Sequence, residues 1–100
     1  MKKIRNGKLY DTDTAKCIGE YQYSHPGDFH YEYEALYVKK TGEFFLYGEG
    51  GAMSPYSKQV DTNSWTAGET IIPYTAQEAR EWAEEHMDAD DYLEYFTAEE

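Results

Sequence analysis

The segment from Tyr31 to Tyr47 constrains the fold of this chain more than any other. From Tyr31 to Val38 two sets of side chains alternate, which is the period-two pattern of a half-buried β-strand. One set is Tyr31, Tyr33, Ala35 and Tyr37, and the other is Glu32, Glu34, Leu36 and Val38. A second apolar run, Phe44 to Tyr47, follows a short connection that carries Gly42. A late glycine in such a connection suits a turn that closes with a left-handed residue. The segment therefore predicts an antiparallel hairpin.

Further strands are expected on both sides of this hairpin. Lys2 to Tyr10 predicts a second hairpin, because the Asn6-Gly7 dipeptide is a strong two-residue turn signal. Ala15 to Tyr23 predicts a strand that is weakened by Gly19, and Glu69 to Tyr74 predicts the last strand.

The last quarter of the chain carries helix signals. Thr75 is a good N-cap, and Glu78 three residues later completes a capping box. We expect one helix from about Ala76 to His86 and a second short helix after the cluster Asp88–Asp91. The apolar positions that recur at helical spacing are Ala76, Ala79, Trp82, Ala83 and Met87 in the first helix, and Tyr92, Leu93, Tyr95 and Phe96 in the second.

This order of strands first and helices last is typical of an α+β fold. We predict an antiparallel sheet of three to five strands with the C-terminal helices packed on one face. Residues 1–100 form a single domain, in which 1–74 are mainly β and loops and 75–100 are acidic helices. The glycine-rich stretch Gly48–Gly68 is either a functional loop or contains a short helical turn near Met53 to Lys58.

Negative charge is concentrated in the predicted helices. The chain has a formal net charge of -11. Residues 1–74 hold ten acidic and eight basic side chains, whereas residues 75–100 hold ten acidic side chains and one basic one, Arg80. Such a surface repels nucleic acid and anionic membranes, so we expect no direct binding to either and a cationic protein surface as the partner.

Helical spacing places several of these acids side by side. Side chains at i, i+3 and i+4 are neighbours on a helix. If all twenty-six residues after Tyr74 were helical, they would span roughly 39 Å and carry about one acid per 4 Å, close to the 3.4 Å phosphate spacing of one DNA strand. The candidate partner-binding residues are Glu78, Glu81, Glu84, Glu85, Asp88, Asp90, Asp91 and Glu94.

Two alternatives to an acidic binding surface stay open at this point. The acids can form an ordinary solvated helix face, although such a face usually interleaves both signs of charge. A tyrosine-rich face can bind a partner instead, because tyrosine and tryptophan are enriched at interface hot spots. The candidate residues for this second surface are Tyr31, Tyr33, Tyr47, Tyr56 and Trp65.

Catalytic, metal and cofactor chemistry has little support in the sequence. The glycine-rich segment at Gly48–Ser54 lacks the Gly-Lys-Ser/Thr ending of a phosphate-binding loop. The histidines are scattered, so we predict no catalytic residue, no metal ligand and no cofactor. A small enzyme would require a pocket that joins Ser54, Glu49 and a histidine.

The cysteine and the N-terminus bear on the cellular location. Cys17 is the only cysteine, so no internal disulfide can form, and we expect it to be a small buried residue. The basic N-terminus lacks the apolar core of a signal peptide, and no run approaches the roughly 20 apolar residues of a membrane-spanning helix. These features predict a cytoplasmic protein.

Three segments, 8–15, 43–54 and 76–83, resemble a family of small proteins found on bacterial phages, plasmids and integrated elements. The resemblance covers most of the chain, and the glycine-rich middle segment is its most specific part. It implies no catalytic residues. The mobile-element setting that it implies also contains acidic anti-CRISPR and anti-restriction inhibitors, several of which resemble DNA in charge. That similarity is one of type and not of motif.

The functional prediction is a non-catalytic, cytoplasmic inhibitor that mimics nucleic acid in a bacterial host cell. Its acidic surface would block the DNA- or RNA-binding groove of a defence complex such as a CRISPR effector. The alternative is an accessory protein-interaction module of a mobile element, which would bind through the tyrosine-rich sheet and the stretch Gly48–Gly68.

Overall fold

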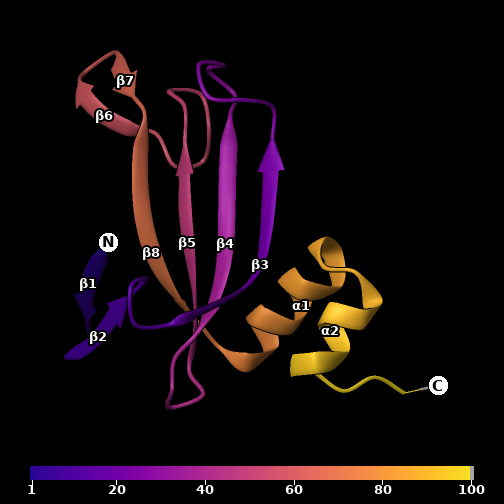
Figure 1. The fold of residues 1–100 in the computed structure, drawn as a ribbon. Coiled ribbons are helices and arrows are strands. Elements are labelled where there is room, and N and C mark those ends of the chain that lie inside the picture. The colour runs from indigo at the N-terminus through magenta and orange to yellow at the C-terminus, as the bar shows by residue number, and fades with distance from the viewer. Residues whose placement is uncertain (100) are drawn as a thin grey trace.

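The computed structural model describes residues 1–99 and has the α+β fold that the sequence predicts. A four-stranded antiparallel sheet forms its centre, and two helices pack against one face of the sheet (Figure 1). The four strands of this sheet are, in spatial order, β3 (Lys16–Tyr23), β4 (Glu32–Val38), β5 (Phe44–Gly50) and β8 (Gly68–Tyr74).

Two small hairpins flank the sheet. The first pairs β1 (Lys2–Arg5) with β2 (Lys8–Asp11), and its turn residues Asn6 and Gly7 both have positive φ, as the Asn-Gly signal predicts. The second pairs β6 (Lys58–Asp61) with β7 (Ser64–Thr66). This second hairpin lies within the glycine-rich stretch, and the segment before it contains no helix but two single hydrogen-bonded turns, Gly51–Ser54 and Ser54–Ser57.

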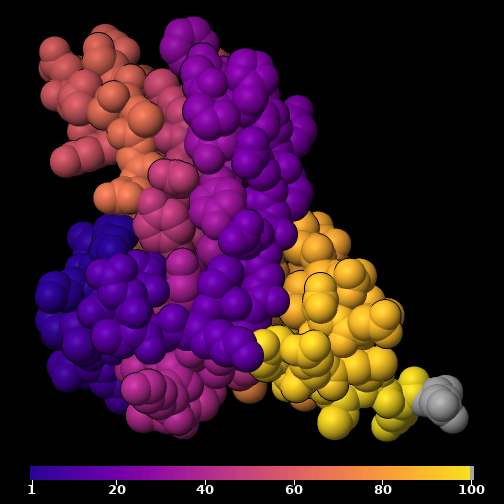
Figure 2. All heavy atoms as spheres, in the orientation of Figure 1, coloured from indigo at the N-terminus to yellow at the C-terminus, as the bar shows by residue number. Residues whose placement is uncertain are grey.

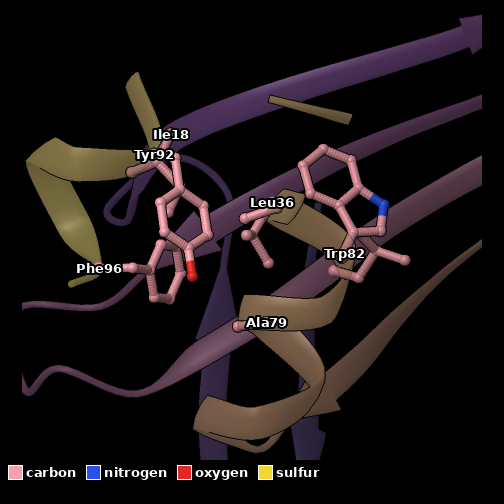
Figure 3. Close-up of a cluster of buried hydrophobic side chains, with 8 residues drawn as sticks. Ile18, Leu36, Ala79, Trp82, Tyr92 and Phe96 are labelled. Atoms are coloured by element: carbon pink, nitrogen blue, oxygen red, sulfur yellow. The ribbon is translucent and has the colours of Figure 1, made fainter. Parts of the chain in front are cut away.

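The helices α1 (Ala76–His86) and α2 (Ala89–Tyr95) cover one face of the sheet near the end where β8 finishes (Figure 1). Ala79 and Trp82 of α1 and Tyr92 of α2 pack against Ile18 and Leu36 of the sheet (Figure 3). The full buried cluster on this face consists of Ile18, Leu36, Leu46, Ala79, Trp82, Ala83, Tyr92 and Phe96.

A second, smaller cluster lies on the opposite face of the sheet. Tyr10 of the first hairpin packs edge-on against Phe45 of β5, with ring centroids 5.5 Å apart, and Ile71 of β8 completes the cluster. The first hairpin therefore covers only part of this face. The rest of the face carries tyrosines from β4 and β5, which lie partly exposed.

The chain that follows β5 packs on the helix-bearing face of the sheet, over Gly48 and Gly50. The ring of Tyr56 lies so close to Gly48 that any Cβ at position 48 would overlap it, and Ser54 lies equally close to Gly50. The Tyr56 hydroxyl donates to Glu34, which also accepts a 3.0 Å hydrogen bond from the Trp82 indole nitrogen. Glu34 thereby joins this loop to α1.

Cys17 is exposed, so the expectation of a buried thiol was wrong. The pairing between β3 and β4 shifts register between Cys17 and Gly19, and this irregularity turns Ile18 toward the helices. Cys17 is left on an edge strand opposite Tyr37, on the face without helices. Local hydrophobicity could not reveal a bulge that depends on the neighbouring strand.

The capping box at the start of α1 is formed as predicted. The Thr75 hydroxyl accepts from the Glu78 backbone N–H at 3.1 Å, and the Glu78 carboxylate accepts from the Thr75 N–H at 2.9 Å. We expect Thr75→Ala to lower the free energy of unfolding by about 1 kcal/mol, because an orphan helix donor loses its partner. Urea denaturation followed by circular dichroism measures this, and an unchanged midpoint would contradict it.

The β4–β5 turn contains an acid-sensitive contact. Glu43 accepts hydrogen bonds from Lys8 at 2.8 Å, Lys39 at 3.2 Å and Thr41 at 3.1 Å. These contacts, Lys8 first, lower the pKa of Glu43 from 4.5 to about 2. A carboxylate with a lowered folded-state pKa contributes stability above its unfolded pKa and loses it as pH falls through the folded one.

We therefore expect Glu43→Gln to be less stable than the wild type above about pH 4.5, with the difference disappearing as pH falls toward about 2. The contribution is small because the pair is exposed. Urea midpoints of both proteins across this pH range provide the measurement. Parallel pH curves for the two proteins would contradict the expectation.

Candidate protein-binding surfaces

The first candidate surface is the outward side of the two helices, which we call the acidic helix face. It consists of the eight acids predicted from the sequence, and every one of them is exposed. Because successive helical residues rotate by about 100°, the four acids of α1 fall within an arc of roughly 120°. This arc lies opposite the buried side of α1, which is formed by Ala79, Trp82 and Ala83. The acids of α2 lie opposite Tyr92 in the same way.

Three of these acids also have structural contacts within the chain. Glu78 belongs to the capping box of α1, and the Asp88 carboxylate caps α2 by accepting from the Asp91 N–H at 2.9 Å. The Glu84 carboxylate accepts a 3.4 Å hydrogen bond from the Tyr92 hydroxyl, which joins the two helices. Among the described residues, the side chains of the other five acids form no such capping or interhelical contact, although Glu81 accepts a 2.9 Å hydrogen bond from Gln77 within α1; the five are Glu81, Glu85, Asp90, Asp91 and Glu94.

The acidic helix face is compact and is not a rod. The backbone is extended at Met87 and Asp88, so the chain turns between the helices and α2 packs beside α1 (Figure 1). A continuous helix of roughly 39 Å is therefore ruled out. The eleven residues of α1 span roughly 16 Å and carry four of the eight acids, whereas the other four lie at the N-cap of α2 and along α2.

No lysine or arginine forms an ion pair with the acidic helix face among residues 1–99, although Arg80 lies on α1 itself, four residues before Glu84. The described ion pairs are Lys8–Glu43, Lys39–Glu43 and the contact of 3.8 Å between His86 and Glu85, which is ionic only when the imidazole is protonated. Lys16 reaches over from the sheet, but its ammonium lies 5.3 Å from the ring centroid of Tyr95 and forms no ion pair.

Crowding of the carboxylates is visible at the start of α2. The neighbouring Asp88 carboxylate raises the pKa of Asp91, and Glu94 and Asp90 add to the effect. Like charges at this spacing disfavour one another, so a cation from outside the chain would relieve the repulsion.

The second candidate surface, which we call the tyrosine face, is the side of the sheet without helices. Tyr33 and Tyr47 meet there edge-on with ring centroids 6.3 Å apart, and Tyr31 lies on the same side of β4. Tyr56, which the sequence also suggested, lies on the opposite face with its hydroxyl on Glu34. Strand alternation determines on which face of the sheet Tyr31, Tyr33 and Tyr47 lie. Tyr56 lies in a loop, where no periodicity predicts the direction of the side chain.

Two glutamates occupy directly opposite positions on neighbouring strands of the tyrosine face. The register of β5 and β8 pairs Glu49 with Glu69, and the Tyr47 hydroxyl lies within hydrogen-bond distance of both carboxylates, at 3.2 Å and 2.5 Å. The Tyr31 hydroxyl donates to the other Glu49 oxygen at 3.4 Å. Burial, followed by the carboxylate of Glu69 and then that of Glu49, raises the pKa of Tyr47, so its hydroxyl stays protonated.

A groove of about 650 Å³ extends from this pair of glutamates toward the end of the sheet. Its sides are the loop between β3 and β4 and the segment from Trp65 to Glu69, and both lie at the end of the molecule that projects away from the helices (Figure 2). The helices lie at the other end. We call it the aromatic groove, and its aromatic and acidic lining residues are Phe29, Tyr31, Trp65, Asp28, Glu49 and Glu69.

The aromatic groove exposes large apolar side chains. Phe29 is 66% exposed and Trp65 is 51% exposed, although both belong to residue types that a small domain normally buries. Asp28 holds the loop beside Phe29, because its carboxylate accepts from the Ser24 hydroxyl and the His30 N–H. These contacts, Ser24 first, lower the pKa of Asp28 and keep it charged.

The residues suggested for an enzyme do not converge. Ser54 and Glu49 lie on opposite faces of β5, and the Ser54 hydroxyl donates to the Gly51 carbonyl at 2.8 Å. His30 shares a hollow of about 270 Å³ with Ser54 but not with Glu49. Within residues 1–99, no group of three or more His, Cys, Asp or Glu side chains is arranged to hold a metal ion.

Comparisons with known proteins leave the chain without an assigned family. No family model, no curated protein and no solved structure matches it. The resemblance to small proteins of phages and plasmids therefore stays a prediction. In the part of the chain that the structure describes, no helix is long and apolar enough to cross a membrane.

Proposed function

We propose that the protein is a non-catalytic inhibitor whose acidic helix face mimics nucleic acid. In this proposal the face occupies the cationic DNA- or RNA-binding groove of a bacterial defence complex, in the manner of an anti-CRISPR protein, and acts in the host cytoplasm. One observation carries the proposal: all eight predicted acids are exposed on two adjacent helices, and no described lysine or arginine pairs with them.

The density of charge on α1 supports mimicry of a nucleic-acid strand. The eleven residues of α1 span roughly 16 Å and carry four exposed carboxylates, about one per 4 Å, which is close to the 3.4 Å phosphate spacing of one DNA strand. A groove lined by lysine and arginine to hold phosphates would therefore meet anions at a similar spacing along this helix. Its flexible side chains can adapt to carboxylates, which also accept hydrogen bonds.

The way the helices are anchored also supports the proposal. Buried contacts of Trp82, Tyr92 and Phe96 fix both helices on the sheet. The carboxylates are therefore presented by a folded scaffold and lose little backbone freedom on binding, which favours affinity.

A competition experiment tests this function. Labelled duplex DNA or guide RNA is bound to CRISPR effectors and restriction nucleases, and the protein is titrated into each complex. We expect stoichiometric displacement from at least one member of the panel, with an affinity that falls as salt rises from about 50 to 300 mM. Failure to displace nucleic acid from any member at the lowest salt would contradict the proposal.

The tyrosine face favours the accessory interaction module as a second candidate function. Exposed Trp65 and Phe29 line the same groove as Tyr31, and aromatic side chains of this kind often dominate interface energies. In that case alanine at Trp65 would abolish partner binding, while neutralised helix acids would leave the affinity nearly unchanged. The same displacement assay separates the two functions.

A further inference from the structure

We propose that the aromatic groove is a separate binding site for an arginine side chain carried by a partner polypeptide. The proposal does not depend on the acidic helix face, because the groove is built from the β3–β4 loop, β5 and the segment from Trp65 to Glu69. It rests on three features of the groove: a pair of glutamates that belong to no described ion pair, exposed aromatic rings, and a volume large enough for a side chain.

The two glutamates repel each other, and a bound cation would relieve this repulsion. Like charges directly opposite one another on an antiparallel sheet are destabilising, and Glu49 and Glu69 occupy such positions. The Tyr47 hydroxyl has a single proton and can donate to only one of the two carboxylates at a time. No lysine or arginine lines the groove among the described residues, and neither glutamate belongs to a described ion pair, although Met1 shares the neighbouring hollow with Glu69.

A guanidinium group matches this arrangement better than an ammonium group. Its planar fork presents several N–H donors in fixed directions, so it can bind two neighbouring carboxylates at once. Its flat face also stacks on aromatic rings, where a cation is attracted to the π-electrons. Tyr31 and Trp65 line the same groove as the glutamates and supply such rings.

The shape of the groove favours a side chain on a polypeptide. The groove is open along one side, and its 650 Å³ exceeds the space that one guanidinium needs. Phe29 and Trp65 stand exposed at its edges and can cover the residues that flank an arginine. The complementary partner is therefore a cationic peptide segment, and a free polyamine is the competing occupant to be tested.

Nuclear magnetic resonance can follow binding through the two tryptophans of the chain. Trp65 lines the groove, whereas Trp82 is buried beneath α1, so the two indole N–H signals report on different places. The probe is a short Gly-Ser-Arg repeat peptide with blocked termini. We expect it to shift the Trp65 signal and leave the Trp82 signal in place, while the citrulline version of the peptide has no effect.

Matched variants distinguish binding in the aromatic groove from binding on the acidic helix face. Glu49→Gln with Glu69→Gln is expected to weaken peptide binding at least tenfold, while Glu81→Gln with Glu85→Gln removes the same charge and changes it less than about twofold. Trp65→Ala is expected to reduce binding as well, and it provides a second test on a side chain that lies outside the core. Circular dichroism confirms that each variant is folded.

Several outcomes would overturn the proposal. These are equal binding of the citrulline peptide, no loss in the Glu49/Glu69 variant, or tighter binding of spermidine than of the arginine peptide. Loss of binding only in the Glu81/Glu85 variant would also overturn it, and would show that the cation binds on the acidic helix face. If the arginine site is disproved in this way, the result of the displacement experiment on nucleic-acid complexes is not affected. The two proposals can therefore fail independently.

Discussion

Replacing Trp82 with alanine is expected to lower the free energy of unfolding by about 3–5 kcal/mol. The indole is only 6% exposed and lies in the cluster between α1 and the sheet (Figure 3). The substitution removes the largest side chain of that cluster and leaves a cavity. It also removes the 3.0 Å hydrogen bond to Glu34, a carboxylate that the sheet and α1 partly enclose.

Such a loss is a large part of the roughly 5–15 kcal/mol that stabilises a typical domain. Urea denaturation followed by circular dichroism near 222 nm gives the measurement. Two controls show where the effect arises. Trp82→Phe keeps most of the apolar volume and should cost less, and Trp65→Ala, on the exposed hairpin, should change stability by less than about 0.5 kcal/mol. A loss below about 1 kcal/mol for Trp82→Ala would contradict the packing described above.

Reversing three charges on the acidic helix face is expected to weaken binding to the nucleic-acid-binding target by about a hundredfold or more. The variant carries Glu81→Lys, Glu85→Lys and Glu94→Lys, which spare the capping residues Glu78 and Asp88. Each reversal replaces an attraction to the cationic groove with a repulsion. Three such changes of about 1 kcal/mol each account for roughly a hundredfold, since 1.4 kcal/mol corresponds to tenfold.

A control with the same net charge makes this result specific. Asp13→Lys, Glu20→Lys and Asp61→Lys also raise the net charge by six, but these residues are exposed elsewhere on the molecule. The control should lose less than about fivefold, because distant charges are screened at physiological salt. Equal losses in the two variants would mean that net charge alone drives binding and would contradict a defined acidic surface.

The parts of the fold that sequence predicted best are those set by local chemistry. The alternation from Tyr31 to Val38, the Asn6-Gly7 turn and the capping box of Thr75 each depend on residues a few positions apart. These local preferences predict the fold correctly because the tertiary contacts favour the same conformations. The exposure of the helix acids follows from the same source, since the apolar stripe of α1 fixes which side faces the sheet.

What the sequence could not reveal depends on contacts between distant segments. The pairing of Glu49 with Glu69 requires the register of β5 and β8, which are separated by the β6–β7 hairpin. The aromatic groove likewise joins Phe29 to Trp65. The β6–β7 hairpin itself was missed because its strands are short and exposed, so neither shows a buried face.

Chemical-shift mapping of the labelled protein on the target found by displacement tests the central claim most directly. We predict that the largest perturbations fall on the outward residues of α1 and α2, from Glu78 to Glu94, and that they fade as salt is added. Perturbations confined to the tyrosine face and the aromatic groove, with the helix signals unmoved, would contradict the proposal that the acidic helices occupy a nucleic-acid-binding groove.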